Sequence, residues 1–66
     1  MTKDEAIKAM KEGAKVTHRY FLSDEWITMQ GNIIKMEQGQ ECWASEFWQD
    51  RQGESWETDW SIYSLM

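Results

Sequence analysis

The segment KVTHRYF, residues 15–21, brings cations, an imidazole and two aromatic rings together in one short stretch. Arg19 can bind a phosphate through two parallel hydrogen bonds, Lys15 can add positive charge, and Tyr20 or Phe21 can stack on a flat ring. The alternation of a β-strand puts four of these side chains on one face: Lys15, Thr17, Arg19 and Phe21. We therefore predict that Lys15, Arg19 and Phe21 contact an anionic ligand. The alternative is a strand edge whose cations pair with the abundant acids of the chain.

Tryptophans are the second group of candidate residues. Four of the five lie within residues 42–60: Trp43, Trp48, Trp56 and Trp60. One such ring buries about 200 Å² and contributes several kcal/mol, so two or three could form the core of a very small domain. Trp60, like Trp26, belongs to a β pattern and is predicted to lie in the core.

The remaining tryptophans have polar neighbours and lie at the ends of predicted elements. They are Trp43, Trp48 and Trp56. Because a small domain has little room to bury five indole rings, we predict that these three contact another subunit or a flat ligand. A nucleobase is one such ligand, since base stacking on an aromatic ring contributes about 1–3 kcal/mol.

Catalytic and metal-binding patterns are weak in this sequence. His18 is the only histidine, and no serine lies in a nucleophile motif. We expect a structural role for His18 and a buried, inert thiol for Cys42, which has no basic neighbour. Paired carboxylates are more common as solvated surface groups than as acid–base pairs. The sequence therefore predicts a protein that is not an enzyme and needs no cofactor or metal.

Charge is distributed unevenly along the chain. Residues 1–22 carry five Lys and Arg against three Asp and Glu, for a balance of +2, whereas residues 23–66 carry two against nine, for −7, which together make −5. Because phosphate neutralisation supplies most non-specific affinity, we expect no general binding to nucleic acid. A small anion could bind where the few cations converge. Alternatively, the acidic part could imitate DNA.

Two helices and several strands must position these residues. Thr2 and Glu5 have capping-box spacing at the start of a helix predicted over 3–12, which ends before Gly13. Alternating patterns predict strands over 14–22, 25–30, 33–37, 41–43 and 56–65, and a short helix is predicted over 45–51 with Ser45 as its N-cap. We expect residues 1–66 to form a single α+β domain: a small antiparallel sheet of four to five strands, an N-terminal helix and a short second helix.

The two ends of the chain resemble a known family. EAIKAMKEGAKVTHRYF is similar to the opening of small phage proteins of the Thoeris anti-defence sponge type, in a run carried here by Lys11, Glu12, Gly13, Lys15, Val16 and Arg19. TDWSIY resembles the Asp-Trp and β pattern near the end of these proteins, and CWASEFW resembles a Trp-x-x-Ser-like segment. The Asp-Trp pair corresponds to Asp59 and Trp60. The chain departs from the family in a shorter middle and in an additional segment, RQGESWE.

The resemblance implies a phage-encoded homo-oligomer, a dimer or tetramer, in the cytoplasm of an infected bacterium. Such a sponge binds cyclic nucleotide immune signals between its subunits and does not cleave them. Under this hypothesis Asp59 joins the candidate ligand contacts. No apolar run near 18 residues and no signal peptide is evident, so we expect no membrane association. The alternative is an acidic phage inhibitor that binds a host defence protein or nucleic-acid-binding protein directly through residues 23–66.

Overall fold

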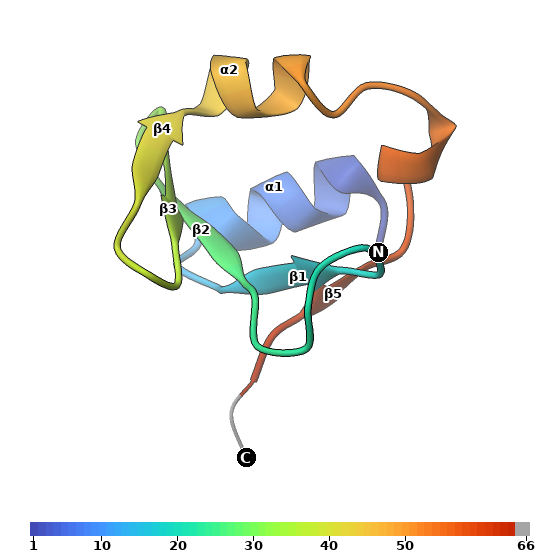
Figure 1. Ribbon diagram of the computed structural model, residues 1–66, viewed down its shortest axis with the longest axis horizontal. Helices are drawn as coiled ribbons and strands as arrows, with labels where there is room; N and C mark the ends of the chain where they lie inside the picture. Colours follow the sequence, from blue (N-terminus) through green and yellow to red (C-terminus); the bar gives the residue numbers. More distant parts are fainter. Residues whose placement is uncertain (65–66) are drawn as a thin grey trace.

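Five short strands form one antiparallel sheet in the computed structural model, which describes residues 1–64. The strands are β1 (Val16–His18), β2 (Ile27–Gln30), β3 (Ile33–Met36), β4 (Glu41–Trp43) and β5 (Trp60–Ile62), in the spatial order β4-β3-β2-β1-β5. The helical elements are α1 (Lys3–Lys11), α2 (Ala44–Gln49) and the 3₁₀-helix η1 (Glu54–Trp56). Figure 1 shows α1 and α2 on the same side of the sheet. The predicted small α+β fold is confirmed.

The start of α1 follows from a complete capping box. The Thr2 hydroxyl accepts a hydrogen bond from the Glu5 amide at 3.2 Å, and the Thr2 amide donates to the Glu5 carboxylate at 2.8 Å. The hydrogen bond from the Thr2 amide to the Glu5 carboxylate, and then interaction of that carboxylate with the Thr2 side chain, hold the pKa of Glu5 below its ordinary value. The helix ends where Gly13 adopts a φ of 98°, a left-handed conformation that favours glycine.

Side-chain alternation separates an inner from an outer face of the sheet. The pairs Val16–Ile27 and His18–Trp60 lie on the inner face, which the helices cover. The buried core residues are Ala6, Met10, Val16, Ile27, Ile34, Phe47 and Trp60. The outer face carries pairs such as Thr17–Ser61, Thr28–Lys35, Ile33–Trp43 and Lys35–Glu41. One face of the sheet is therefore packed and the other is not covered by these helices.

Only one of the two predicted core tryptophans lies in the core. Trp60 is 2% exposed, which confirms the prediction, but Trp26 is only partly buried. The register pairs Val16 with Ile27, so Ile27 points inward and the preceding Trp26 points to the outer face. There the Lys15 ammonium lies 4.3 Å from the centre of the Trp26 ring. The prediction for Trp26 was wrong because adjacent side chains point to opposite faces of the sheet, and Ile27 is the one that points inward.

The last predicted strand is much shorter in the structure. Residues 54–56 form η1, and β5 covers Trp60–Ile62, while Leu65 lies outside the described residues. Asp59 interrupts the extended backbone with a φ of 70°. The indole Nε1 of Trp60 donates to the Trp56 carbonyl at 2.8 Å, which ties η1 to β5. Two aromatic residues that alternation assigned to one strand therefore belong to different elements.

Local hydrogen bonds also shift two other boundaries. The strand predicted over 14–22 ends at His18, because the Phe21 amide donates to the His18 carbonyl at 2.9 Å and closes a turn. The helix α2 begins at Ala44, with Trp43 rather than Ser45 at the N-cap and without a side-chain cap. None of the helices within residues 1–64 is long and apolar enough to cross a membrane.

Replacing Thr2 with alanine should destabilise the fold by about 1 kcal/mol, because the substitution removes the N-cap hydrogen bond. Urea unfolding at neutral pH measures the difference. The lowered pKa of Glu5 means that its contribution is present above its unfolded value of 4.5 and is lost as pH falls through the lower folded value. T2A keeps the amide of residue 2 but removes the interaction of its hydroxyl with the Glu5 carboxylate, so the gap between T2A and the wild type should narrow in acid. A gap that is independent of pH would contradict a role of the Thr2 hydroxyl in lowering the pKa of Glu5.

Candidate functional site

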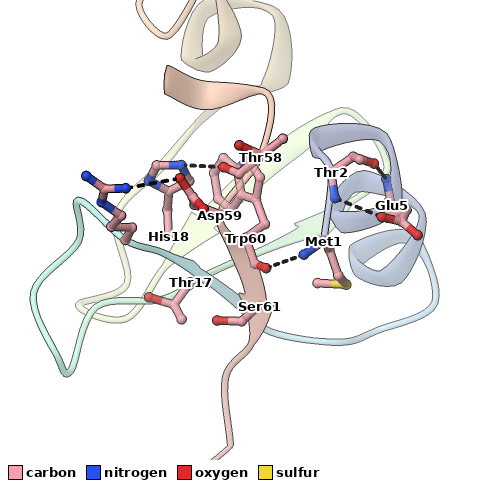
Figure 2. Close-up of a pocket in the computed structure, with 10 residues that line it drawn as sticks. Met1, Thr2, Glu5, Thr17, His18, Thr58, Asp59, Trp60 and Ser61 are labelled. Carbon is pink, nitrogen blue, oxygen red and sulfur yellow. Dashed lines mark hydrogen bonds and ion pairs between the residues drawn. The ribbon is translucent and has the colours of Figure 1, made fainter. Parts of the chain in front are cut away.

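An open groove of about 730 Å³ lies at the β1–β5 side of the sheet, and its lining residues come from three separate parts of the chain (Figure 2). The lining residues are Met1, Thr2, Glu5, Thr17, His18, Arg19, Thr58, Asp59, Trp60 and Ser61. Most of these side chains carry a hydroxyl, a carboxylate or a charged nitrogen. The groove is therefore suited to a polar ligand with hydroxyl and anionic groups.

The start of the chain forms one wall of the groove because it pairs with β5. The nitrogen of Met1 donates to the Trp60 carbonyl at 2.7 Å, and the Trp60 amide donates to the Met1 carbonyl at 3.2 Å. The Lys3 amide also donates to the Glu57 carbonyl at 2.8 Å. These contacts satisfy edge groups of β5 and bring the first turn of α1 beside it. The capping-box residues Thr2 and Glu5 thereby enter the groove.

Arg19 and Asp59 form an ion pair in the groove. The Nη1–Oδ2 distance is 3.6 Å, and the two side chains are 69% and 47% exposed. The Arg19 amide donates to the Asp59 carbonyl at 3.2 Å, so the two residues are also held together through the backbone. Exposed ion pairs contribute only about 0–1 kcal/mol, so a ligand anion could compete for Arg19 at little cost.

Asp59 is the only non-glycine residue within 1–64 that has a positive φ. Aspartate tolerates the left-handed region better than most residues, because its short side chain can hydrogen-bond locally. Strained backbone often accompanies functional groups, so this geometry is consistent with a role for the Asp59 carboxylate in the groove.

His18 forms the inner part of the groove and is 3% exposed. Its Nδ1 accepts a hydrogen bond from the Tyr20 amide at 3.1 Å, which assigns the proton to Nε2. Nε2 then donates to the Thr58 carbonyl at 2.8 Å. Because backbone groups occupy both ring nitrogens, His18 has no free nitrogen for base catalysis. The predicted structural role of His18 is confirmed.

Aromatic rings pack behind and beside the groove. We define this aromatic cluster as His18, Tyr20, Phe21, Trp48, Trp56 and Trp60. The Trp56 ring centre lies 4.4 Å from that of His18, and Trp48 meets Trp60 edge-on at 5.5 Å. Such contacts add about 0.5–1.5 kcal/mol per pair beyond the area that they bury. The cluster therefore stabilises the wall of the groove as well as the core.

The structure divides the predicted site residues among several places. Arg19 and Asp59 meet in the groove, and Phe21 and Trp56 lie in the aromatic cluster with ring centres 6.2 Å apart. The prediction that Phe21 shares a face with Lys15 and Arg19 was wrong, because the turn after His18 breaks the alternation.

The other three predicted residues lie away from the groove. Trp48 packs on Trp60 beneath the Lys3 ammonium, which is 4.8 Å from its ring centre, beside a second depression of about 620 Å³. Lys15 lies against Trp26 on the outer face of the sheet. Trp43 is 56% exposed on β4, at the sheet edge opposite β5. The predicted residues therefore do not form one continuous site within a single chain.

Several groove residues had no signal in the sequence. The hydroxyls of Thr17, Thr58 and Ser61 reach the groove through the pairing of β1 with β5, and the hydroxyl of Thr2 reaches it through the pairing of Met1 with Trp60. The Thr2–Glu5 spacing predicted a helix start but not the position of that start beside β5. These residues depend on contacts between distant parts of the chain.

Metal binding and thiol chemistry find no support in the described part of the chain. Within residues 1–64, no three His, Cys, Asp or Glu side chains are grouped so that they could hold a metal ion. Cys42 is partly buried outside the groove, and burial raises the pKa of its thiol, which lowers its reactivity at neutral pH. The chemistry of the groove is therefore that of hydrogen bonding, ion pairing and stacking.

Comparisons with models of known protein families, with curated proteins and with solved structures find no match to this chain. The resemblance to sponge proteins therefore stays a prediction from short motifs. The groove is interpreted below from its own residues and their chemistry.

Replacing His18 with phenylalanine should destabilise the protein by about 1–3 kcal/mol. The substitution keeps a ring in the aromatic cluster but leaves the Tyr20 amide and the Thr58 carbonyl without their side-chain partner. Urea unfolding followed by tryptophan fluorescence measures the change. Serine at the exposed Thr58 is a suitable control, because Thr58 contributes its backbone carbonyl. A stability of H18F equal to the wild type would contradict the structural role of His18.

Proposed function

We propose that this protein is a non-enzymatic binder that sequesters a cyclic nucleotide signal in the groove between α1, β1 and β5. The observation that carries the proposal is Arg19. Its guanidinium is well exposed, has only a long ion pair with Asp59, and lies where hydroxyl side chains adjoin an aromatic cluster. A nucleotide can use all three: its phosphate pairs with a guanidinium, its sugar hydrogen-bonds with hydroxyl groups, and its base stacks on an aromatic ring.

Each part of a nucleotide has a plausible partner in the groove. Arg19 can form a bidentate hydrogen bond with a phosphate, because its guanidinium is planar and exposed. Asp59 can accept hydrogen bonds from ribose hydroxyls, and Ser61 can donate or accept there. Tyr20, which is 54% exposed beside Arg19, presents a ring for base stacking. In this arrangement the phosphate replaces the Asp59 carboxylate as the ion-pair partner of Arg19, so binding needs no further cation.

Binding without turnover agrees with the residues of the groove. A hydrolase or cyclase would need an activated nucleophile or a base near the phosphate. Backbone groups occupy both nitrogens of His18, the only histidine of the chain. These properties suit a protein that lowers the free concentration of a signal by holding it. In an infected bacterium, such a protein would act against nucleotide-based defence, as the resemblance to sponge proteins implies.

A second copy of the chain is part of this proposal. The outer face of the sheet carries Trp43 and Ile33 in register, and the helices of the same chain lie on the other side. Charged side chains on this face include Lys15, Lys35 and Glu41, which together carry +1, whereas the whole chain has a net charge of −5. Two outer faces would therefore meet with far less repulsion than two helical faces. A homo-oligomer built in this way would bury the exposed indole of Trp43.

An acidic inhibitor of a host protein is the second candidate function. Four carboxylates are exposed along α2, η1 and their flanks: Glu46, Asp50, Glu54 and Glu57. In the described part of the chain, none of the four forms an ion pair. These four carboxylates could contact a basic nucleic-acid-binding surface. Salt-sensitive capture of a purified DNA-binding defence protein, together with no nucleotide binding, would favour this candidate.

Nucleotide binding can be tested by calorimetry with a panel of cyclic di- and trinucleotides. We expect micromolar or tighter binding of at least one of them and recovery of the intact ligand after heat denaturation. Arg19→Gln should weaken binding about 10- to 100-fold, the effect of losing a charge-assisted hydrogen-bond pair. Lys11→Gln is the matched control, because it removes the same charge from the exposed last turn of α1, outside the groove lining and the outer face. Absence of binding across the panel would overturn the proposal.

The oligomer can be tested by light scattering at several concentrations. We expect a dimer or tetramer for the wild type and dissociation for Trp43→Glu, which places a charge in the proposed interface. Leu22→Glu adds the same charge to an exposed apolar residue in the β1–β2 loop and serves as the control. A strict monomer for the wild type would contradict the proposed interface.

A further inference from the structure

Arg51 is a cation in the segment between α2 and η1 that the groove does not use. Its Cζ lies 4.0 Å from the centre of the Phe47 ring and 5.6 Å from that of Trp56. Its Nη1 donates to the Phe47 carbonyl at 3.3 Å, near the end of α2. These contacts hold the guanidinium in one orientation on an aromatic surface.

Within residues 1–64, Arg51 has no carboxylate partner. The ion pairs there join Arg19 with Asp59 and Lys35 with Glu41. The Nε atom of Arg51 is buried and has no hydrogen-bond acceptor, an arrangement that costs folding free energy. Capping of α2 uses only one of the five N–H groups of the guanidinium. The helix cap therefore uses one N–H donor of Arg51 and leaves its positive charge without a carboxylate partner.

Arg51 is connected to the groove by two aromatic rings. The Trp56 ring centre lies 5.4 Å from that of Tyr20, and the Arg19 Cζ lies 5.6 Å from the Tyr20 ring centre. We call the series Arg51, Trp56, Tyr20 and Arg19 the cation–aromatic strip. It has a guanidinium at each end and two rings between them, and it enters the groove at Arg19.

We propose that the cation–aromatic strip extends the ligand site of the groove and selects a nucleotide with two separate phosphates, such as a cyclic dinucleotide, over a mononucleotide. This inference rests on the proposed function. One phosphate binds Arg19 in the groove, a base stacks on Tyr20 beside Trp56, and the second phosphate binds the outward N–H groups of Arg51. A mononucleotide has a single phosphate and engages one end of the strip at a time.

The charges of the strip support a ligand whose negative charges lie on two separate phosphates. Arg19 and Arg51 together supply two positive charges, which match the two phosphates of a cyclic dinucleotide. In a chain with a net charge of −5, this local compensation is needed because the other exposed carboxylates repel an anion. Stacking adds affinity without sequence preference, because every nucleobase has a π-face.

The test compares affinities for cyclic di-AMP, cyclic di-GMP and AMP, measured by calorimetry. For the wild type, we expect at least one cyclic dinucleotide to bind at least tenfold more tightly than AMP. Arg51→Gln should weaken dinucleotide binding about tenfold, the effect of losing a charge-assisted contact, and thereby remove most of this preference. Tyr20→Leu should weaken dinucleotide binding about tenfold through lost stacking. Lys11→Gln, at the exposed end of α1, controls for the change in net charge.

Because Arg51 also caps α2, thermal unfolding of each variant is measured alongside binding. Arg51→Lys retains the charge but lacks the planar fork, so we expect a folded protein with a reduced dinucleotide preference. If Arg51→Gln, Arg51→Lys and Tyr20→Leu keep the wild-type preference while Arg19→Gln loses binding, the strip is wrong and the groove stands. If the wild type binds none of these probes or the wider cyclic nucleotide panel, the proposed function fails and the strip fails with it.

Discussion

Trp60 connects the chain start, β1, α2 and η1 with its own strand, β5. Its backbone pairs with Met1 on one side and lies in register with His18 on the other, and its indole donates to the Trp56 carbonyl. Its ring also packs against His18, Phe21, Trp48 and Trp56. The chain start, β1, β5, α2 and η1 are therefore held together through the backbone and side chain of one residue. The groove exists because these elements meet there.

A chain of 66 residues has little apolar surface to spare, so the same rings serve the core and the candidate site. His18 shows this most clearly. It is buried, both of its nitrogens bond to the backbone, and its ring also forms part of the groove. A rigid wall of this kind is favourable for ligand binding, because less conformational entropy is lost when the ligand is ordered. It also means that many substitutions near the groove will affect folding and binding together.

Local patterns in the sequence predicted the helix α1 and the strands β2 to β4, because neighbouring residues determine them. Predictions were less accurate where distant contacts decide. Trp26 fits a β pattern but lies outside the core, since the register with Val16 begins at Ile27. Trp56 is a different case: it fits a strand pattern but belongs to a 3₁₀-helix, which local hydrogen bonds form from the Trp56 amide to the Gly53 carbonyl and from the Glu57 amide to the Glu54 carbonyl. Arg19, Asp59 and Trp43 were all predicted as ligand contacts, and the structure brings Arg19 and Asp59 together but places Trp43 at the opposite edge of the sheet.

The sequence by itself determined the fold class, the acidic balance and the residues that could bind an anion or a flat ring. Composition and local spacing are sufficient for these properties, because each depends on residue type and near neighbours. Only the tertiary structure decided which of those residues meet. The pairing of β5 with β1 and with Met1 brings Asp59 to Arg19 and Thr2 to Ser61 in one groove, across nearly the whole chain. Such contacts depend on strand register and buried packing, which no local pattern in the sequence specifies.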